Sequence, residues 1–292
     1  MSQTPSSQSP SPEPSPTVGQ PPVGQPTVGL FVTCLVDLMR PSVGFAALRL
    51  LERAGAQVVA PENQTCCGQP AYNSGDFKNA RAIARDVIEA FEGFDSVVAP
   101  SGSCAGMIRV HYPKLFADDA QWRARAEALA ARTMELTQYL ASHLNLNDVS
   151  ATLNATATYH DSCASRREMG VVNEPRQLLA TVDGLSLKEL DDVETCCGFG
   201  GLFSIKFPDV SGAIADKKAQ MIEDTQAELL VGADMGCLMN LSGKLKRRAQ
   251  DGRPGVRVYH IAEVLAGMTD APGVGDGIGD GAEDDGKKEN GA

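Results

Sequence analysis

The eight cysteines of this chain fall into one order that occurs twice, and this pattern constrains the fold more than any other feature. The second copy follows the first at offsets of 129, 130 and 133 residues. A repeated order at nearly constant spacing indicates a tandem duplication of one structural unit. The copies are Cys34, Cys66-Cys67-Gly68 and Cys104, and then Cys163, Cys196-Cys197-Gly198 and Cys237.

The composition of the two ends sets them apart from the rest of the 292-residue chain. Residues 1–27 contain eight prolines and six serines, and residues 270–292 combine many glycines with seven acids. Segments with so few large apolar side chains cannot offset the entropy of ordering them, so we expect both tails to be disordered. The duplication then divides the remainder into a first domain, 28–150, and a second, 151–269.

The charge and the hydropathy exclude several classes of protein. The chain has 26 basic and 37 acidic residues and a net charge of −11, which argues against a nucleic-acid binder. The N-terminus has no basic and apolar signal sequence, and no apolar run is long enough to span a membrane. We therefore expect a cytoplasmic location, where cysteines serve as metal ligands or catalytic groups more often than as disulfides.

Strand-like and helix-like segments alternate in both halves, which predicts the α/β class with parallel βαβ units. We expect two tandem Rossmann-like domains in which each cysteine follows a strand or opens a helix. The sequence favours strands at 28–33, 57–60, 96–99, 156–159, 185–190 and 228–231, helices at 42–55, 76–91, 174–181 and 210–225, and an additional helix over 117–143.

Four thiols per half match the ligand number of an iron–sulfur cluster. The carboxyl ends of parallel strands are where open α/β sheets bind ligands, and helix N-termini there stabilise an anionic cluster. A structural zinc site usually has cysteine pairs two to four residues apart, which this chain lacks. Disulfides and unligated buried thiols also compete with a cluster as explanations of the cysteines. We predict one cluster per half, a [4Fe–4S] centre, with [2Fe–2S] left open.

The spacing of Cys34, Cys66-Cys67 and Gly68 resembles the cysteine-rich CCG domain found in the B subunit of heterodisulfide reductase and in glycolate oxidase iron–sulfur subunits. The full pattern of that domain contains a fifth cysteine three residues before the last. Ser101 and Asp234 stand at the corresponding places in this chain. The simplest expectation is one cubane per half with both of these residues unligated. The alternative is an oxygen of Asp234 bound to one iron.

Longer segments resemble the lactate utilization protein A family over residues 28–268. The matching segments include Phe31-Val-Thr-Cys-Leu, Pro100-Ser-Gly-Ser-Cys, Cys196-Cys-Gly-Phe-Gly-Gly-Leu-Phe, Gly236-Cys-Leu-Met-Asn and Tyr259-His-Ile-Ala-Glu-Val-Leu. The resemblance implies an iron–sulfur component that acts in the oxidation of L-lactate to pyruvate with two partners, lactate utilization proteins B and C. The alternative is a subunit that assembles the same complex without electron transfer and holds one cluster or none.

Some other polar residues lie near the second cysteine motif. His160 precedes Cys163 by three residues, and with Asp234 it is a weak candidate for a catalytic role. The basic side chains of Arg166, Arg167 and Lys206 are candidates for binding a carboxylate substrate, although a role on the solvated surface is favoured.

The glycines of the second motif suggest a tight turn rather than a nucleotide site. A dinucleotide-binding fingerprint that starts at Gly198 and Gly200 requires a third glycine at the position of Phe203, so the fingerprint fails. We expect these glycines to let the backbone turn around a cluster. His260 is expected to begin a helix or to lie in the core.

Overall fold

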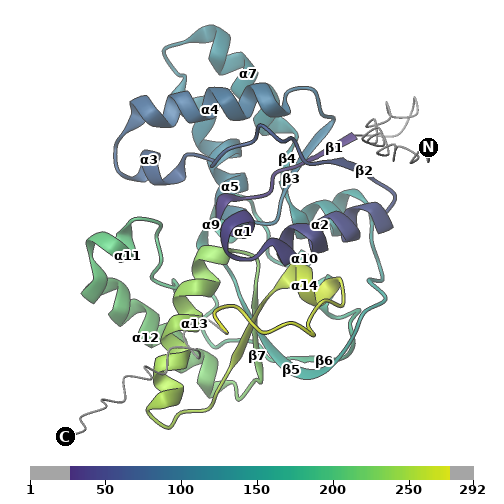
Figure 1. The fold of residues 1–292 in the computed structure, drawn as a ribbon, viewed down its shortest axis with the longest axis vertical. Helices are drawn as coiled ribbons and strands as arrows, with labels where there is room; N and C mark the ends of the chain where they lie inside the picture. The colour runs from purple at the N-terminus through teal and green to yellow at the C-terminus, as the bar shows by residue number, and fades with distance from the viewer. Residues whose placement is uncertain (1–26, 277–292) are drawn as a thin grey trace, which may run out of the picture.

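The computed structural model describes residues 27–276, in which two parallel sheets of four strands each follow one another along the chain. The first sheet has the order β2-β1-β3-β4 and the second the order β6-β5-β7-β8 (Figure 1). All strand pairs are parallel. The identical strand order confirms the predicted α/β class and the tandem repeat.

The elements of the two halves follow a similar succession. Those of the first half are β1 (Thr27–Leu30), α1 (Cys34–Met39), α2 (Pro41–Arg53), β2 (Gln57–Val59), α3 (Gln69–Asn73), α4 (Phe77–Phe91), β3 (Ser96–Ala99), α5 (Gly102–Gly106), the π-helical turn η1 (Met107–His111), α6 (Tyr112–Leu115), α7 (Ala120–Ala131), β4 (Thr133–Glu135), α8 (Leu136–Gln138) and the π-helical turn η2 (Tyr139–His143). Those of the second half are β5 (Thr152–His160), α9 (Cys163–Arg167), α10 (Glu174–Leu179), β6 (Asp183–Leu187), α11 (Phe203–Lys206), α12 (Pro208–Asp224), β7 (Leu229–Gly232), α13 (Met235–Gln250), β8 (Arg257–His260) and α14 (Ile261–Leu265).

The strand registers show how closely the halves correspond. In the first sheet Val28 pairs with Ser96, and in the second Ala157 pairs with Leu229. Ala157 follows Val28 by 129 residues and Leu229 follows Ser96 by 133, the same offsets as between the cysteines that follow these strands. Each residue of β1 therefore has a defined counterpart in β5, which allows the two halves to be compared residue by residue.

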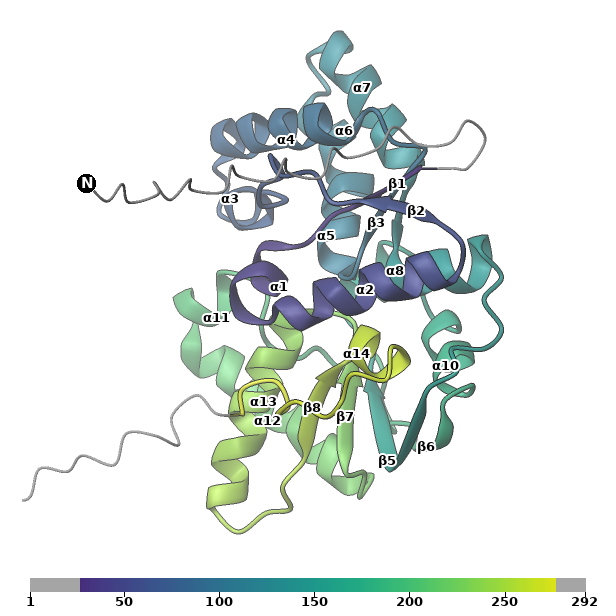
Figure 2. The ribbon, with the colours of Figure 1, turned by 45° about the vertical axis from the view of Figure 1, so that its right-hand side comes forward.

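Helix α2 belongs to a hydrophobic core that both halves share. Its buried residues belong to the same apolar cluster as those of the second sheet, and it lies between the first sheet and α14 (Figure 2). At its start, Arg40 Nε donates to both carboxylate oxygens of Glu263 at 2.8 and 2.9 Å. The domain boundary between residues 150 and 151 stays a prediction. This hydrophobic core extends across it.

The predicted helix over 117–143 is wrong in part. Helix α7 ends at Ala131, and Thr133–Glu135 form strand β4 at the edge of the first sheet. The Ala- and Leu-rich composition favours a helix, but the buried Thr133 and Glu135 pair with β3 instead. Pairing with the sheet therefore outweighs the local helix propensity of these residues.

The described residues extend beyond residue 269, where the acidic tail was expected to begin. Val274 is buried, and its backbone N–H donates to the carbonyl of Val258 at 2.6 Å. Residues 1–26 and 277–292, the greater part of both predicted tails, lie outside the described residues.

Candidate metal centres

Each outer cysteine lies where a strand passes into a helix. Cys34 is the first residue of α1 and Cys163 the first of α9. Cys104 and Cys237 lie in the first turns of α5 and α13, which follow β3 and β7. The residue before α5, Ser101, caps this helix because its hydroxyl accepts a hydrogen bond from the Cys104 N–H at 3.3 Å. The thiols thus lie at helix N-termini, as expected.

The glycine of each CCG motif turns the chain back toward the preceding sulfur. Gly68 and Gly198 have φ angles of 80° and 87°, a left-handed conformation that favours glycine. Their N–H groups donate to the sulfurs of Cys66 and Cys196 at 3.4 and 3.3 Å. Gly200 and Gly201 also have positive φ angles, which confirms the predicted tight turn.

The four thiols of each half come together at one cavity. We call these groups the first thiol site (Cys34, Cys66, Cys67, Cys104) and the second thiol site (Cys163, Cys196, Cys197, Cys237). The cavities measure about 310 and 340 Å³. Gln69, Ser103, Phe199, Gly201 and Asp234 line both of them, so the two sites are neighbours across a shared cleft.

The spacing and the protonation of the thiols suit a shared metal group. Cys34 Sγ lies 3.8 Å from Cys66 Sγ, close enough for both thiols to bind one metal group. Hydrogen bonds from Cys34 and Cys67 lower the pKa of Cys66, while the same contact raises the pKa of Cys34. Neighbouring thiolates repel one another, so ionising all four requires a cationic group among them.

The donor set fits an iron–sulfur group. All eight cysteines are free thiols, which are the soft ligands that such clusters require. Cys67, Cys104, Cys197 and Cys237 are buried, and the other four face the cavities more openly. Backbone N–H groups already point at sulfur in both sites, an arrangement that stabilises negative charge on a cluster.

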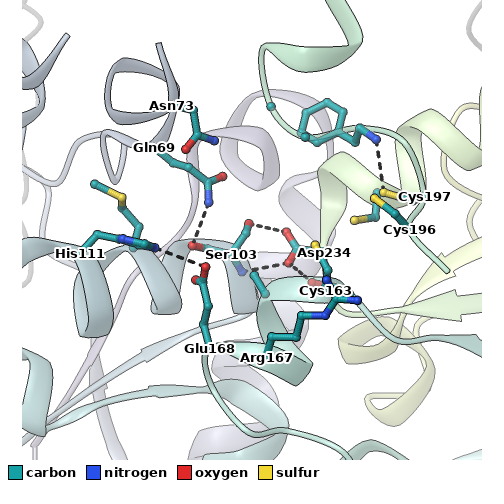
Figure 3. Close-up of a pocket in the computed structure, with 17 residues that line it drawn as sticks. Gln69, Asn73, Ser103, His111, Cys163, Arg167, Glu168, Cys196, Cys197 and Asp234 are labelled. Atoms are coloured by element: carbon teal, nitrogen blue, oxygen red, sulfur yellow. Dashed lines mark hydrogen bonds and ion pairs between the residues drawn. The ribbon is translucent and has the colours of Figure 1, made fainter. Parts of the chain in front are cut away.

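Asp234 connects the two sites through a hydrogen-bond network, of which Figure 3 shows the contact with Ser103 beside the second site. Its Oδ1 accepts from Ser101 Oγ at 3.0 Å and from Ser103 Oγ at 2.7 Å. Its Oδ2 accepts from the Ser103 N–H and from Ser162 Oγ, both at 2.9 Å. Ser101 and Asp234, the two residues at the place of the fifth cysteine, therefore bind each other across the interface. A catalytic role for Asp234 stays a prediction.

His160 lies at the end of β5 beside the second thiol site. One of its ring nitrogens and the sulfurs of Cys197 and Cys237 all lie within 4.8 Å of one another. Burial, reinforced by the positive charge of Lys218, lowers the pKa of His160 to about 3. The imidazole is therefore neutral at physiological pH and has a free lone pair.

The cleft beside the second site contains polar residues that sequence reasoning missed. His111 Nε2 lies 3.3 Å from Glu168 Oε1, and Gln69 Nε2 donates to the Ser103 carbonyl at 3.3 Å. Gln69 directly follows the first CCG motif, which was the available signal. Of the basic candidates, Arg167 lines the cavity of the second site.

Two other basic candidates and one histidine have different surroundings. Arg166 Nε pairs with Glu194 at 3.3 Å, and Lys206 is not among the residues that line either thiol cavity within 27–276. His260 is fully buried and caps α14, as expected: its Nδ1 accepts from the Ala262 N–H at 3.1 Å.

Comparison with known proteins first defines the class. Residues 28–109 and 157–242 each match the family model of the cysteine-rich CCG domain. Two such domains, each with four gathered thiols, make this a tandem CCG-domain protein.

The chain belongs to the lactate utilization protein A family. It is 52% identical over 238 residues to lactate utilization protein A of Exiguobacterium sp. (strain ATCC BAA-1283 / AT1b), covering 81% of this chain and 95% of that protein. It is 49% identical over 236 residues to lactate utilization protein A of Bacillus subtilis (strain 168), covering 81% and 97%. Both predicted resemblances are thereby confirmed.

A solved structure of a hypothetical protein from Helicobacter pylori shares the fold, with a TM-score of 0.60 and 10% sequence identity. The match covers 86% of this chain and half of that one. At this identity the likeness concerns the fold alone. Among the helices of residues 27–276, none is long and apolar enough to cross a membrane.

Proposed function

We propose that this protein is the iron–sulfur component of a multiprotein system that oxidises L-lactate to pyruvate, and that it transfers electrons through its two thiol sites. The observation that carries the proposal is the pair of four-thiol sites on opposite sides of one cleft. The names of its relatives supply the connection to lactate.

The chain's own residues would hold one cluster in each site. The four cysteines of each site supply the thiolates, and the N–H groups of Gly68 and Gly198 donate to sulfur. A bound cluster supplies one-electron redox chemistry. Asp234 and its serine partners hold the two sites at a fixed separation, because the network connects α5, α9 and α13.

We infer that the remaining parts of the oxidation belong to partners. The family suggests lactate utilization proteins B and C for this role, in the cytoplasm. The cleft between the sites is lined by the guanidinium group of Arg167, the carboxylate of Glu168 and the imidazole of His111. These residues would bind or orient a polar molecule that reaches the second thiol site.

Anaerobic purification followed by iron and sulfide analysis tests the proposal. We expect about eight irons per chain, four for each cubane, and a broad absorption at about 400 nm that dithionite bleaches. A colourless protein without iron after reconstitution would contradict the proposal. That result would favour a subunit that assembles the complex without transferring electrons.

A further inference from the structure

His160 is a buried polar side chain that lacks a hydrogen bond. It is 1% exposed, and neither ring nitrogen has a hydrogen-bond partner among residues 27–276. Leaving a buried polar group unpaired destabilises a protein, and such groups are rare in folded proteins. We therefore expect a ring nitrogen of His160 to bind a hydrogen-bonding or metal partner that residues 27–276 do not supply.

The first half shows that packing does not require a polar ring at this position. The registers that align Val28 with Ala157 also align Phe31 with His160. Phe31 is fully buried in an apolar cluster. Since a phenyl ring fills the position in one half, the buried imidazole in the other half needs a reason beyond packing.

The surroundings of the imidazole point to a metal. A ring nitrogen of His160 and the sulfurs of Cys197 and Cys237 all lie within 4.8 Å of one another. A nitrogen and a sulfur bound at about 2.0 and 2.3 Å to one tetrahedral metal lie about 3.5 Å apart. His160 therefore lies close enough for its ring nitrogen to reach a metal that a neighbouring thiolate binds.

A second difference between the halves adds positive charge at the same site. The buried positions of α4 and α12 follow one pattern, which places Lys218 where the first half has Val87. Lys218 is fully buried, and its Nζ donates to the Asp192 carbonyl at 3.1 Å. The paired positions are Ala80 and Ser211, Ala84 and Ala215, Val87 and Lys218, Ile88 and Ala219, and Phe91 and Ile222.

We propose that His160 is a nitrogen ligand of one iron of the group held by the second thiol site, beside Cys197 and Cys237, an assignment that rests on the proposed function. The two sites are then different in kind, since the first, with Phe31 at this position, has thiolate ligands alone. Imidazole brings no negative charge to the metal, and Lys218 offsets some of the charge of the thiolates. The second thiol site therefore has the higher reduction potential of the two.

The test uses the full chain, reconstituted anaerobically with ferrous iron and sulfide. The variant Cys66→Ser weakens the first site, so that the signal comes from the second. Pulsed electron paramagnetic resonance of the reduced protein should show strong coupling to a bound nitrogen. Labelling histidine alone with ¹⁵N should change this coupling. His160→Phe copies the residue of the first half, and it should abolish the coupling and lower the midpoint potential of the second site.

The control His143→Phe removes an exposed histidine, which stacks on Tyr139, and should leave the coupling unchanged. Bound iron without histidine coupling, or with only the weak coupling of a hydrogen bond, would overturn the ligand assignment and leave the proposed function intact. Protein that takes up no iron would overturn both. Should His160→Phe not fold, the comparison of labelled and unlabelled wild-type chains decides by itself.

Discussion

Replacing Asp234 by alanine should destabilise the protein by about 2–4 kcal/mol, because four donors lose their acceptor. The N–H of Ser103 lies in the first turn of α5 and has no partner within the helix, so its loss accounts for about 1.5–3 kcal/mol. The Ser162 hydroxyl adds about 0.5–1 kcal/mol. The hydroxyls of Ser101 and Ser103 lie 3.2 Å apart and can pair with each other, so they add little.

Urea unfolding of the metal-free chain, followed by circular dichroism under anaerobic conditions, measures this loss. A slope of about 3 kcal/mol per molar urea converts it into a midpoint lowered by about 1 M. Asp234→Asn retains one acceptor and should lose about half as much, and Ser103→Ala, which removes donors only, should lose about 1 kcal/mol. A midpoint for Asp234→Ala within about 0.2 M of wild type would refute the assigned role of the network.

The same variant separates a structural from a catalytic Asp234. If Asp234→Ala retains its full iron content and full lactate-dependent turnover, a catalytic role is eliminated. Full iron content with lost turnover would favour that role. Loss of iron from both sites together would instead identify Asp234 as the residue that keeps the two sites in place.

Three further perturbations test the rest of the molecule. Cys66→Ser and Cys196→Ser should each remove about half of the bound iron and abolish growth on L-lactate but not on glucose, because a serine hydroxyl is a harder and less available ligand; unchanged iron in both would dismiss the ligands. Gly102→Ala should destabilise the protein by about 1–3 kcal/mol, since its methyl group would overlap a serine of α9. The control Gly243→Ala, with space around it, should stabilise α13 by up to about 1 kcal/mol. Equal shifts of the two variants in thermal unfolding would contradict the close contact of α5 with α9. Burial raises the pKa of Glu135 from 4.5 to about 7, so the folded state holds this proton more tightly than the unfolded state. The stability should therefore fall as the pH rises from about 4.5 to 7. In Glu135→Gln the urea midpoint should change less over this pH range, and an unchanged slope would refute the assignment to Glu135.

The sequence alone was sufficient for the features that repeat along the chain. Two copies of one cysteine order predicted the tandem halves, and alternating strands and helices predicted parallel sheets. The CCG motif and the longer matching segments identified the family. These features are local, because a strand followed by a turn and a cysteine is determined by residues that are neighbours in the chain.

The tertiary structure decided what depends on contacts between distant residues. Strand β4 forms because Thr133 and Glu135 pair with β3, although the surrounding composition favours a helix. Helix α2 completes the core of the second half, which no pattern within the helix reveals.

The surroundings of the two thiol sites also depend on residues that are far apart in the chain. Ser101 and Asp234 share a hydrogen bond although they are 133 residues apart. His160 became distinct from any other buried histidine only when the strand registers showed that it occupies the position of Phe31 in the other repeat. Composition and spacing report which groups are present, whereas packing determines which of them share one cavity and which remain without a partner.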